Sequence, residues 1–163
     1  MRIAAWGHPA SEFEPGADGP AQAKDWLGRL REAGVEMYFP FVLSGGKTYF
    51  ESDALGPPER DLLGPVMQAA NELDLEVHPI LGMGGLVGAG RHTYQNPYEK
   101  TEVPDWAESW PCPSWGENHE VTVRAADEMV SNYRPPGIHL DYARYPNSSV
   151  LVEAPCACER CQE

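Results

Sequence analysis

The apolar and polar positions of the 163-residue chain predict an alternation of strands and helices. Short apolar runs predict strands at residues 2–6, 35–42, 75–81 and 137–142. Apolar residues at helical spacing predict helices at residues 20–34, 57–74 and 114–133. Pro65 is expected to perturb the first turns of the middle helix, because proline lacks the backbone N–H. This alternation predicts an α/β fold with a parallel sheet.

The connections between these elements differ in length at the two ends of the predicted sheet. Those that follow a strand are long and rich in glycine, proline and aromatic residues, at residues 7–19, 44–57 and 82–116. Those that precede a strand are short. Parallel α/β folds place their sites at the carboxyl ends of the strands. The long loops therefore indicate that the functional face lies at that end.

Residues two apart share one face of a strand, and this rule separates apolar from ionisable side chains. In the fourth predicted strand it puts Ile138 and Leu140 toward helices, and His139 and Asp141 on the opposite face. The residues assigned to that opposite face in the other strands are Trp6, His8, Glu36, Tyr38, Glu76 and His78. A doubly wound sheet is apolar on both faces, whereas the mouth of a barrel interior can be polar. The pattern therefore favours a (β/α) barrel.

The length of the chain fits only part of such a barrel. An eight-stranded barrel typically takes about 250 residues, and the sequence predicts four β/α units. The last residues, CACERCQE, have the pattern of the opening turn of a fourth helix. We therefore expect residues 1–163 to form one domain, the N-terminal half of a (β/α)8 TIM barrel. A half barrel exposes strand edges, so we expect a fragment of a longer protein, or self-association.

Composition narrows the classes of partner. A net charge of −13 disfavours nucleic acid and anionic membrane surfaces. The first residues lack the pattern of a secretory signal, and the apolar stretch at residues 79–90 is too short to span a membrane. The sequence therefore assigns no compartment. Five Trp, seven Tyr and four Phe offer flat faces for sugar rings or bases, although such residues more often belong to the core.

Several motifs occur together along the chain: VEMYFPFVLSGGKTYFES, LEVHPIL, WPCPSWGENHEV, GIHLDYARYP and CACERCQE. In this order, and over nearly the whole chain, they resemble the glycoside-hydrolase-like proteins that include the family-10-like glycosidases. GIHLDYARYP is the most specific of them. The resemblance implies a TIM barrel that acts on polysaccharide, or descends from enzymes that do. Pro79 and Ile80 replace a small residue and a tryptophan that the family tends to have.

Asp141 is the first candidate for a catalytic carboxylate. Glycoside hydrolysis normally uses two carboxyl groups, about 5 Å apart for retention and about 6.5–9.5 Å apart for inversion. Glu36 and Glu76 are the partner candidates in this chain, and a later strand of a longer relative is the other source. The alternative for Asp141 is a structural role, capping a loop or pairing with Arg144.

Side chains around Asp141 are candidates for substrate binding. Arg144 can hold substrate hydroxyls or keep Asp141 ionised, and His78 and His139 can bond a sugar or orient Asp141. The remaining candidates are Trp6, His8, Glu36, Tyr38, Glu76, Trp106, Tyr142 and Tyr145. The same candidate residues support a second hypothesis, namely a non-catalytic carbohydrate-binding or inactive barrel fragment.

A metal-dependent TIM-barrel hydrolase is the third hypothesis. Its ligands would be His8, His78, His139 and Asp141, because imidazole and carboxylate groups together bind Zn²⁺. The sequence holds no H-x-x-x-H pair, which weakens this hypothesis. The glycosidase hypothesis, in contrast, requires no cofactor.

The four cysteines raise a separate question. Cys156, Cys158 and Cys161 form a C-x-C-x-x-C motif, and Cys112 is a fourth ligand candidate. Four thiolates suit a structural zinc, disulfides would form in an exported protein, and free thiols are the third alternative. In each case we expect the cysteines to fix the loop after the fourth predicted strand.

Overall fold

The computed structural model describes residues 1–15, 19–83, 92–95, 110–146 and 156–163. The strands are β1 (Ala4–Gly7), β2 (Met37–Ser44), β3 (Lys47–Thr48), β4 (Glu76–Val77), β5 (Ile80–Gly82) and β6 (His139–Asp141). The helices are α1 (Pro9–Glu12), α2 (Gly19–Glu32), α3 (Leu63–Leu73), α5 (Gly116–Tyr133) and α6 (Glu159–Gln162). The predicted alternation of strand and helix is confirmed.

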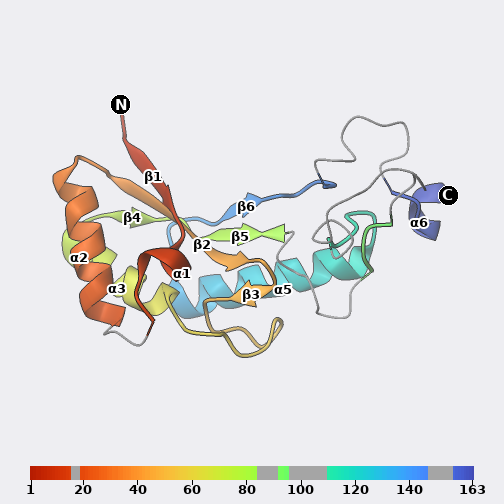
Figure 1. Cartoon of the computed structure of the whole chain (residues 1–163), viewed down its shortest axis with the longest axis horizontal. Coiled ribbons are helices and arrows are strands. Elements are labelled where there is room, and N and C mark those ends of the chain that lie inside the picture. Colours follow the sequence, from red (N-terminus) through yellow and green to blue (C-terminus); the bar gives the residue numbers. More distant parts are fainter. Residues whose placement is uncertain (16–18, 84–91, 96–109, 147–155) are drawn as a thin grey trace.

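The strands form a parallel sheet whose spatial order follows the chain (Figure 1). β1 pairs with β2, β2 with β4 and β5, and β5 with β6, all in parallel. Among the described strands only the short β3 is antiparallel, and it forms a hairpin with the end of β2. A doubly wound sheet reverses its strand order at a switch point. The uninterrupted order is instead that of the first part of a (β/α) barrel.

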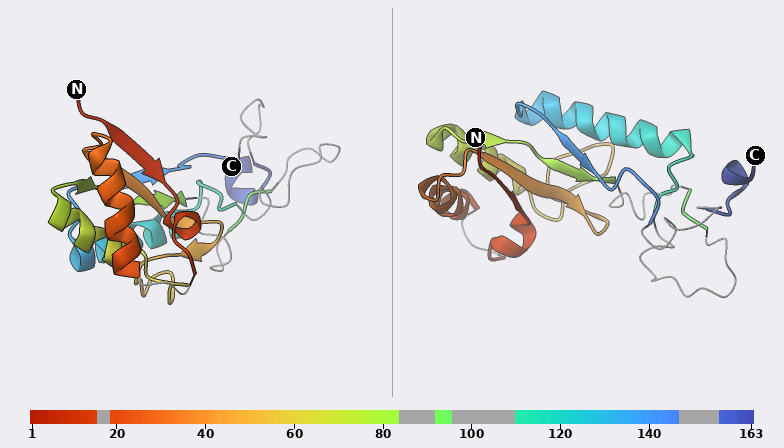
Figure 2. Two further views of the ribbon diagram at one scale, coloured as in Figure 1. Left: turned by 60° about the vertical axis from the view of Figure 1, so that its left-hand side comes forward. Right: turned by 90° about the horizontal axis from the view of Figure 1, so that it is seen from above.

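The main core lies between the sheet and the helices α2, α3 and α5. The apolar stripes of these helices are buried at Leu27, Val66 and Met129, where they meet Val42 and Val77 of the strands. Full burial of one such side chain stabilises the fold by about 1.5–3 kcal/mol. Neighbouring helices contact each other, α2 with α3 and α3 with α5, and Figure 2 shows them in chain order.

Two boundaries differ from the prediction. Helix α3 begins at Leu63 rather than at residue 57, so Pro65 lies in its first turn, where no backbone N–H is needed. The predicted turns at residues 57–62 are not helical, which is the expected perturbation, because Pro65 has no N–H to donate to the carbonyl of residue 61. The third predicted strand is divided into β4 and β5, because Pro79 has no N–H to donate to the sheet.

A smaller core lies beyond the carboxyl ends of β5 and β6, around α6 and the start of α5 (Figure 1). Its buried members are Tyr94, Trp110, Cys112, Cys156 and Cys158. The two cores leave several apolar side chains exposed, among them Leu140, which is 51% exposed. The prediction that Leu140 packs against helices is wrong, whereas Ile138 does contact the main core. No helix in the described part of the chain is long and apolar enough to span a membrane.

Candidate functional site

Asp141 is the last residue of β6, at the carboxyl edge of the sheet. In the parallel register it lies beside Gly82, and His139 lies beside Ile80. Gly82 leaves the space next to the carboxylate free of a side chain. The backbone N–H of Tyr142 donates to Asp141 Oδ1 over 2.7 Å. The predicted placement of Asp141 at the carboxyl end of a strand is confirmed.

Aromatic and imidazole rings lie on the sheet face turned away from α2, α3 and α5, and they come from β1, β2, β6 and the residue after β4. We call this face the inner face. Its side chains are Trp6, Phe39, Phe41, His78 and His139. Phe39 stacks on His78 with ring centroids 5.1 Å apart. His139 approaches Trp6 edge-on at 5.1 Å. Trp6 is 57% exposed, so this apolar and imidazole surface is open to a ligand.

The loop after β6 extends the inner face beyond Asp141. Tyr142 has a φ of 56°, a left-handed conformation that costs a non-glycine residue about 1–3 kcal/mol. Neighbouring contacts hold it there. The ring of Tyr142 meets Trp110 edge-on at 5.6 Å, and the Arg144 guanidinium lies 5.2 Å from the Tyr142 ring centroid. Trp110 Nε1 donates to the carbonyl oxygen of Arg144 over 2.8 Å.

His8 lies at the carboxyl end of β1, on the same side as this loop. Its ring is stacked on Phe41 at 4.4 Å, with the two planes 2° apart. Phe41 also contacts Tyr142, at a centroid distance of 6.4 Å. The structure therefore brings together seven of the predicted residues, namely Trp6, His8, His78, His139, Asp141, Tyr142 and Arg144.

Tyr38 does not belong to the inner face, and its assignment there is wrong. It is completely buried in the main core, because Tyr38 aligns with Ala5 while Phe39 aligns with Trp6. Its hydroxyl donates to Glu12 Oε2 over 2.7 Å. Burial, together with the hydrogen bond to Glu12, raises the pKa of Tyr38, so the phenol stays neutral.

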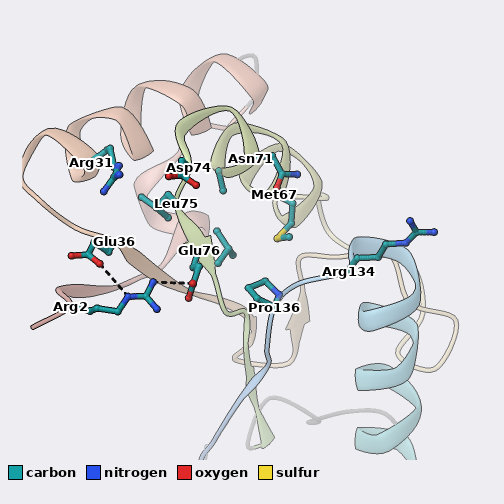
Figure 3. A pocket seen from close by; sticks show the side chains of 12 residues that line it. Arg2, Arg31, Glu36, Met67, Asn71, Asp74, Leu75, Glu76, Arg134 and Pro136 are labelled. Atoms are coloured by element: carbon teal, nitrogen blue, oxygen red, sulfur yellow. Dashed lines mark hydrogen bonds and ion pairs between the residues drawn. The ribbon is translucent and has the colours of Figure 1, made fainter.

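Glu36 and Glu76 lie at the opposite, amino edge of the sheet (Figure 3). There Arg2 binds Glu36 Oε2 over 3.2 Å and Glu76 Oε1 over 3.0 Å. The Arg2 guanidinium, and after it His78, hold the pKa of Glu76 below its usual value. These side chains line an open pocket of about 630 Å³.

The position of Glu76 excludes it as the partner of Asp141. Glu76 precedes Gly82, the neighbour of Asp141, by six residues, which at about 3.3 Å per residue is about 20 Å. Paired glycosidase carboxylates lie within about 10 Å of each other. Glu36 binds the same Arg2 side chain as Glu76 does, so it lies at the same edge of the sheet. Neither predicted partner acid is therefore in reach of Asp141.

The histidines do not assemble the metal site of the third hypothesis. Within the described residues, the cysteines form the one group of three or more His, Cys, Asp or Glu side chains close enough to hold an ion. Phenylalanine rings lie against the imidazoles instead, Phe41 against His8 and Phe39 against His78 and His139. Trp106, another predicted binding residue, lies outside the described part of the chain.

Sequence reasoning missed three aromatic residues of this region, namely Phe39, Phe41 and Trp110. Phe39 and Phe41 occupy alternate positions of β2, which indicates that they share one face of the strand. The face predicted to carry the site is instead that of Glu36 and Tyr38. Trp110 lies in the WPCPSW stretch, whose tryptophan before a cysteine is the available signal. Predicted Tyr145 lies nearby, and its hydroxyl is 2.8 Å from Ser114 Oγ.

The four cysteines converge beside this loop. All four Sγ atoms lie within 4.8 Å of one another, and no disulfide joins them. The hydrogen bond from Cys112, with further bonds from backbone amides, lowers the pKa of Cys156 to about 5. Asn118 of α5 fixes the surrounding segments, because its side-chain amide donates to the carbonyl oxygens of His92 and Cys112 over 2.9 and 2.8 Å.

No family model matches the chain, and the comparison with curated proteins gives no match. Solved structures do match it. The PgaB (BpsB) glycoside hydrolase domain from Bordetella bronchiseptica has a TM-score of 0.65 and 12% identity, over 85% of this chain and 43% of that one. Alpha-L-fucosidase isoenzyme 2 from Paenibacillus thiaminolyticus has a TM-score of 0.61 and 19% identity, over 99% of this chain and 25% of that one.

A third similar structure is the maltogenic alpha-amylase AmyB from Thermotoga neapolitana, with a TM-score of 0.56 and 18% identity over 88% of this chain and 39% of that one. The chain spans less than half the length of each of these three proteins. At these identities the likeness shows the fold alone. The fold is that of part of a (β/α) barrel, of the kind that glycoside hydrolases have.

Proposed function

We propose that this chain forms part of a glycoside hydrolase, and that sugar binds on the inner face at the carboxyl edge of the sheet. The observation that carries the proposal is the position of Asp141. It ends a barrel strand on the same face as Trp6 and His139, beside a glycine. In (β/α) barrels the ends of the strands at this face supply the catalytic residues.

The chemistry of the surrounding residues supports a sugar ligand. Trp6 is 57% exposed and Tyr142 39% exposed, and the Arg144 guanidinium, which can donate to hydroxyl groups, lies over the rings of Tyr142 and Trp110. The overall charge of −13 suits a neutral ligand. The similar folds of named glycoside hydrolases and the GIHLDYARYP motif, which resembles family-10-like glycosidases, support the same class.

Asp141 is proposed as one of the two carboxylates of the reaction. Its Oδ1 accepts the N–H of Tyr142 over 2.7 Å, which orients the group. The second carboxylate then comes from a strand of the barrel that follows in a longer relative.

The test uses a protein in which this chain is joined to the rest of the barrel, and compares it with its Asp141→Asn variant on two substrates suggested by the similar structures, 4-nitrophenyl α-L-fucoside and maltoheptaose. We expect Asp141→Asn to lower turnover by about 10²–10⁴-fold, the usual contribution of a proton-transferring group. Sugar affinity, measured by quenching of tryptophan fluorescence, should be retained. Asp74→Asn is the matched control, since Asp74 is exposed at the amino edge and in a left-handed conformation that asparagine tolerates.

A non-catalytic carbohydrate-binding function is the second candidate. It is favoured by the aromatic inner face together with the distance between Asp141 and both predicted partner acids. Binding of either sugar without turnover by the unmutated protein with the complete barrel supports this function. Absence of both binding and turnover on these sugars and on a wider glycoside panel contradicts both candidates.

A further inference from the structure

The sulfur atoms of the four cysteines have the spacing of a tetrahedral metal site. Cys112 Sγ lies 3.6 Å from Cys158 Sγ and 3.5 Å from Cys161 Sγ, and all four sulfurs lie within 4.8 Å of one another. Four thiolates at about 2.3 Å from a central Zn²⁺ are about 3.8 Å apart. The sulfurs therefore already surround a space of the right size for one ion.

We propose that Cys112, Cys156, Cys158 and Cys161 bind one Zn²⁺ as four thiolates, and that this site fixes the conformation of residues 142–146, the loop that follows Asp141. On binding, each thiol loses its proton to solvent and its sulfur donates an electron pair to the metal, with no change of oxidation state. With four protein ligands the ion has no open position, so its role is structural. The site is independent of the proposed glycosidase activity.

Polar groups around the cluster suit thiolates rather than disulfides. The backbone N–H of Gln95 donates to Cys156 Sγ over 3.3 Å. The hydroxyls of Ser114 and Tyr145 lie 3.2 and 3.4 Å from Cys161 Sγ, where they can donate to a metal-bound sulfur. Such outer contacts orient the ligands and spread the negative charge of a four-thiolate site.

The local backbone also fits metal binding. Cys158 precedes the first turn of α6, and the N–H of Cys161 donates to its carbonyl oxygen over 2.9 Å. This turn points both sulfurs the same way, as paired cysteines do in structural zinc sites. Cys112 arrives from the other side of the cluster, from the segment before α5. A single ion thus joins two segments that are far apart in the sequence.

The cluster is connected to the site by short contacts. Tyr145, four residues after Asp141, reaches Cys161 through its hydroxyl, and Trp110, two residues before Cys112, donates to the Arg144 carbonyl. Between these anchors lies Tyr142 with its left-handed backbone. A strained conformation persists only where its surroundings hold it. Zn²⁺ would supply that restraint, because it fixes both anchors at once.

Metal analysis of the full chain tests the first half of the proposal. Protein produced with added ZnCl₂ and then gel-filtered should retain about one zinc ion per chain, the content of a single four-thiolate site. Exchange for Co²⁺ should give the strong visible and sulfur-to-metal bands of tetrahedral thiolate coordination. Cys112→Ser and Cys158→Ser should lose the ion, whereas His119→Gln, an exposed residue on neighbouring α5, should keep it.

The Co²⁺ measurement uses the unmutated chain, so it decides the matter even if the serine variants fail to fold. Absence of stoichiometric metal, with the cysteines found as free thiols or as disulfides, overturns the proposal. Stoichiometric iron with inorganic sulfide overturns it in favour of an iron–sulfur cluster.

Hydrogen exchange tests the second half. Removal of zinc by a strong chelator should accelerate exchange in the peptide covering residues 139–146, and ZnCl₂ should reverse the effect. Exchange at residues 19–32 of α2, which packs on α3, serves as the internal control. Equal exchange of the 139–146 peptide with and without zinc overturns the link between the metal and the loop.

Discussion

At the scale of single residues, the site depends on the absence of a side chain as much as on the carboxylate. A Cβ atom at position 82 would lie 2.7 Å from the carbonyl oxygen of Leu43 and 3.7 Å from the Tyr142 ring. Glycine is therefore required for the close approach of β2 and β5.

Gly82→Ala is predicted to destabilise the protein by about 1–3 kcal/mol, as overpacking against a backbone atom does. Gly28→Ala is the matched control. Gly28 lies within α2, and a methyl group there would meet no atom within 4 Å, so alanine should stabilise by about 0.5–1 kcal/mol. Urea unfolding of both variants measures these opposite signs. An unchanged midpoint for Gly82→Ala would show that β2 and β5 can separate.

At the scale of elements, one acidic side chain of α5 fastens the loop that follows β3. Glu128 accepts hydrogen bonds from the Ser52 hydroxyl over 2.5 Å and from the Ala54 N–H over 3.1 Å. Nearby, the Tyr133 hydroxyl accepts the N–H of Glu51 over 2.8 Å. Burial raises the pKa of Tyr133 to about 12. These polar contacts add to the apolar packing of the same loop, in which Phe50 is fully buried in the main core and Ala54 and Leu55 pack against it.

Glu128→Ala should lower the free energy of unfolding by about 1–3 kcal/mol, because it leaves the Ser52 and Ala54 donors without their acceptor. Glu120→Ala, at an exposed position of the same helix, makes the same chemical change without this contact. It should have an effect within about 0.5 kcal/mol. Chemical denaturation of both proteins measures the difference. Equal stabilities would mean that water replaces the carboxylate at no cost.

At the scale of the whole molecule, the inner face is open. In a closed barrel, side chains from the remaining strands fill the interior, yet here Trp6 is 57% exposed. The exposed apolar residues outside this face include Val123 and Leu140. Apolar surface of this kind marks a place for a further partner, whether a second copy or the rest of a barrel.

We predict that the isolated chain associates through this face. Sedimentation at increasing concentration should show species heavier than the 18.0 kDa monomer, and dilution should reverse their formation. Trp6→Glu should shift the equilibrium toward monomer, because it places a charge in the contact. Val123→Glu, on the exposed side of α5, should leave it unchanged. A strictly monomeric unmutated chain at all concentrations contradicts the prediction.

The alternation of side chains along a strand predicts which residues share a face, but it does not always predict which face is buried. Alternation correctly placed His139 and Asp141 on one face of β6, because the ionisable residues of this strand alternate with the apolar residues Ile138 and Leu140. In β2 both sets contain aromatic residues, so the pattern divides Tyr38 from Phe39 without saying which faces the helices. The alignment of Tyr38 with Ala5 shows that Tyr38 faces the helices, and the phenol can be buried because Glu12 accepts a hydrogen bond from its hydroxyl.

The sequence by itself determined the order of strands and helices, the position of Asp141 at a strand end, and the presence of four thiols. These follow from local periodicity and residue type. The tertiary structure alone decided that Arg2 binds Glu76 at the edge of the sheet opposite Asp141, that Tyr38 points into the core, and that four sulfurs meet within 4.8 Å. Those properties depend on the register and packing of segments far apart in the chain, which no local pattern encodes.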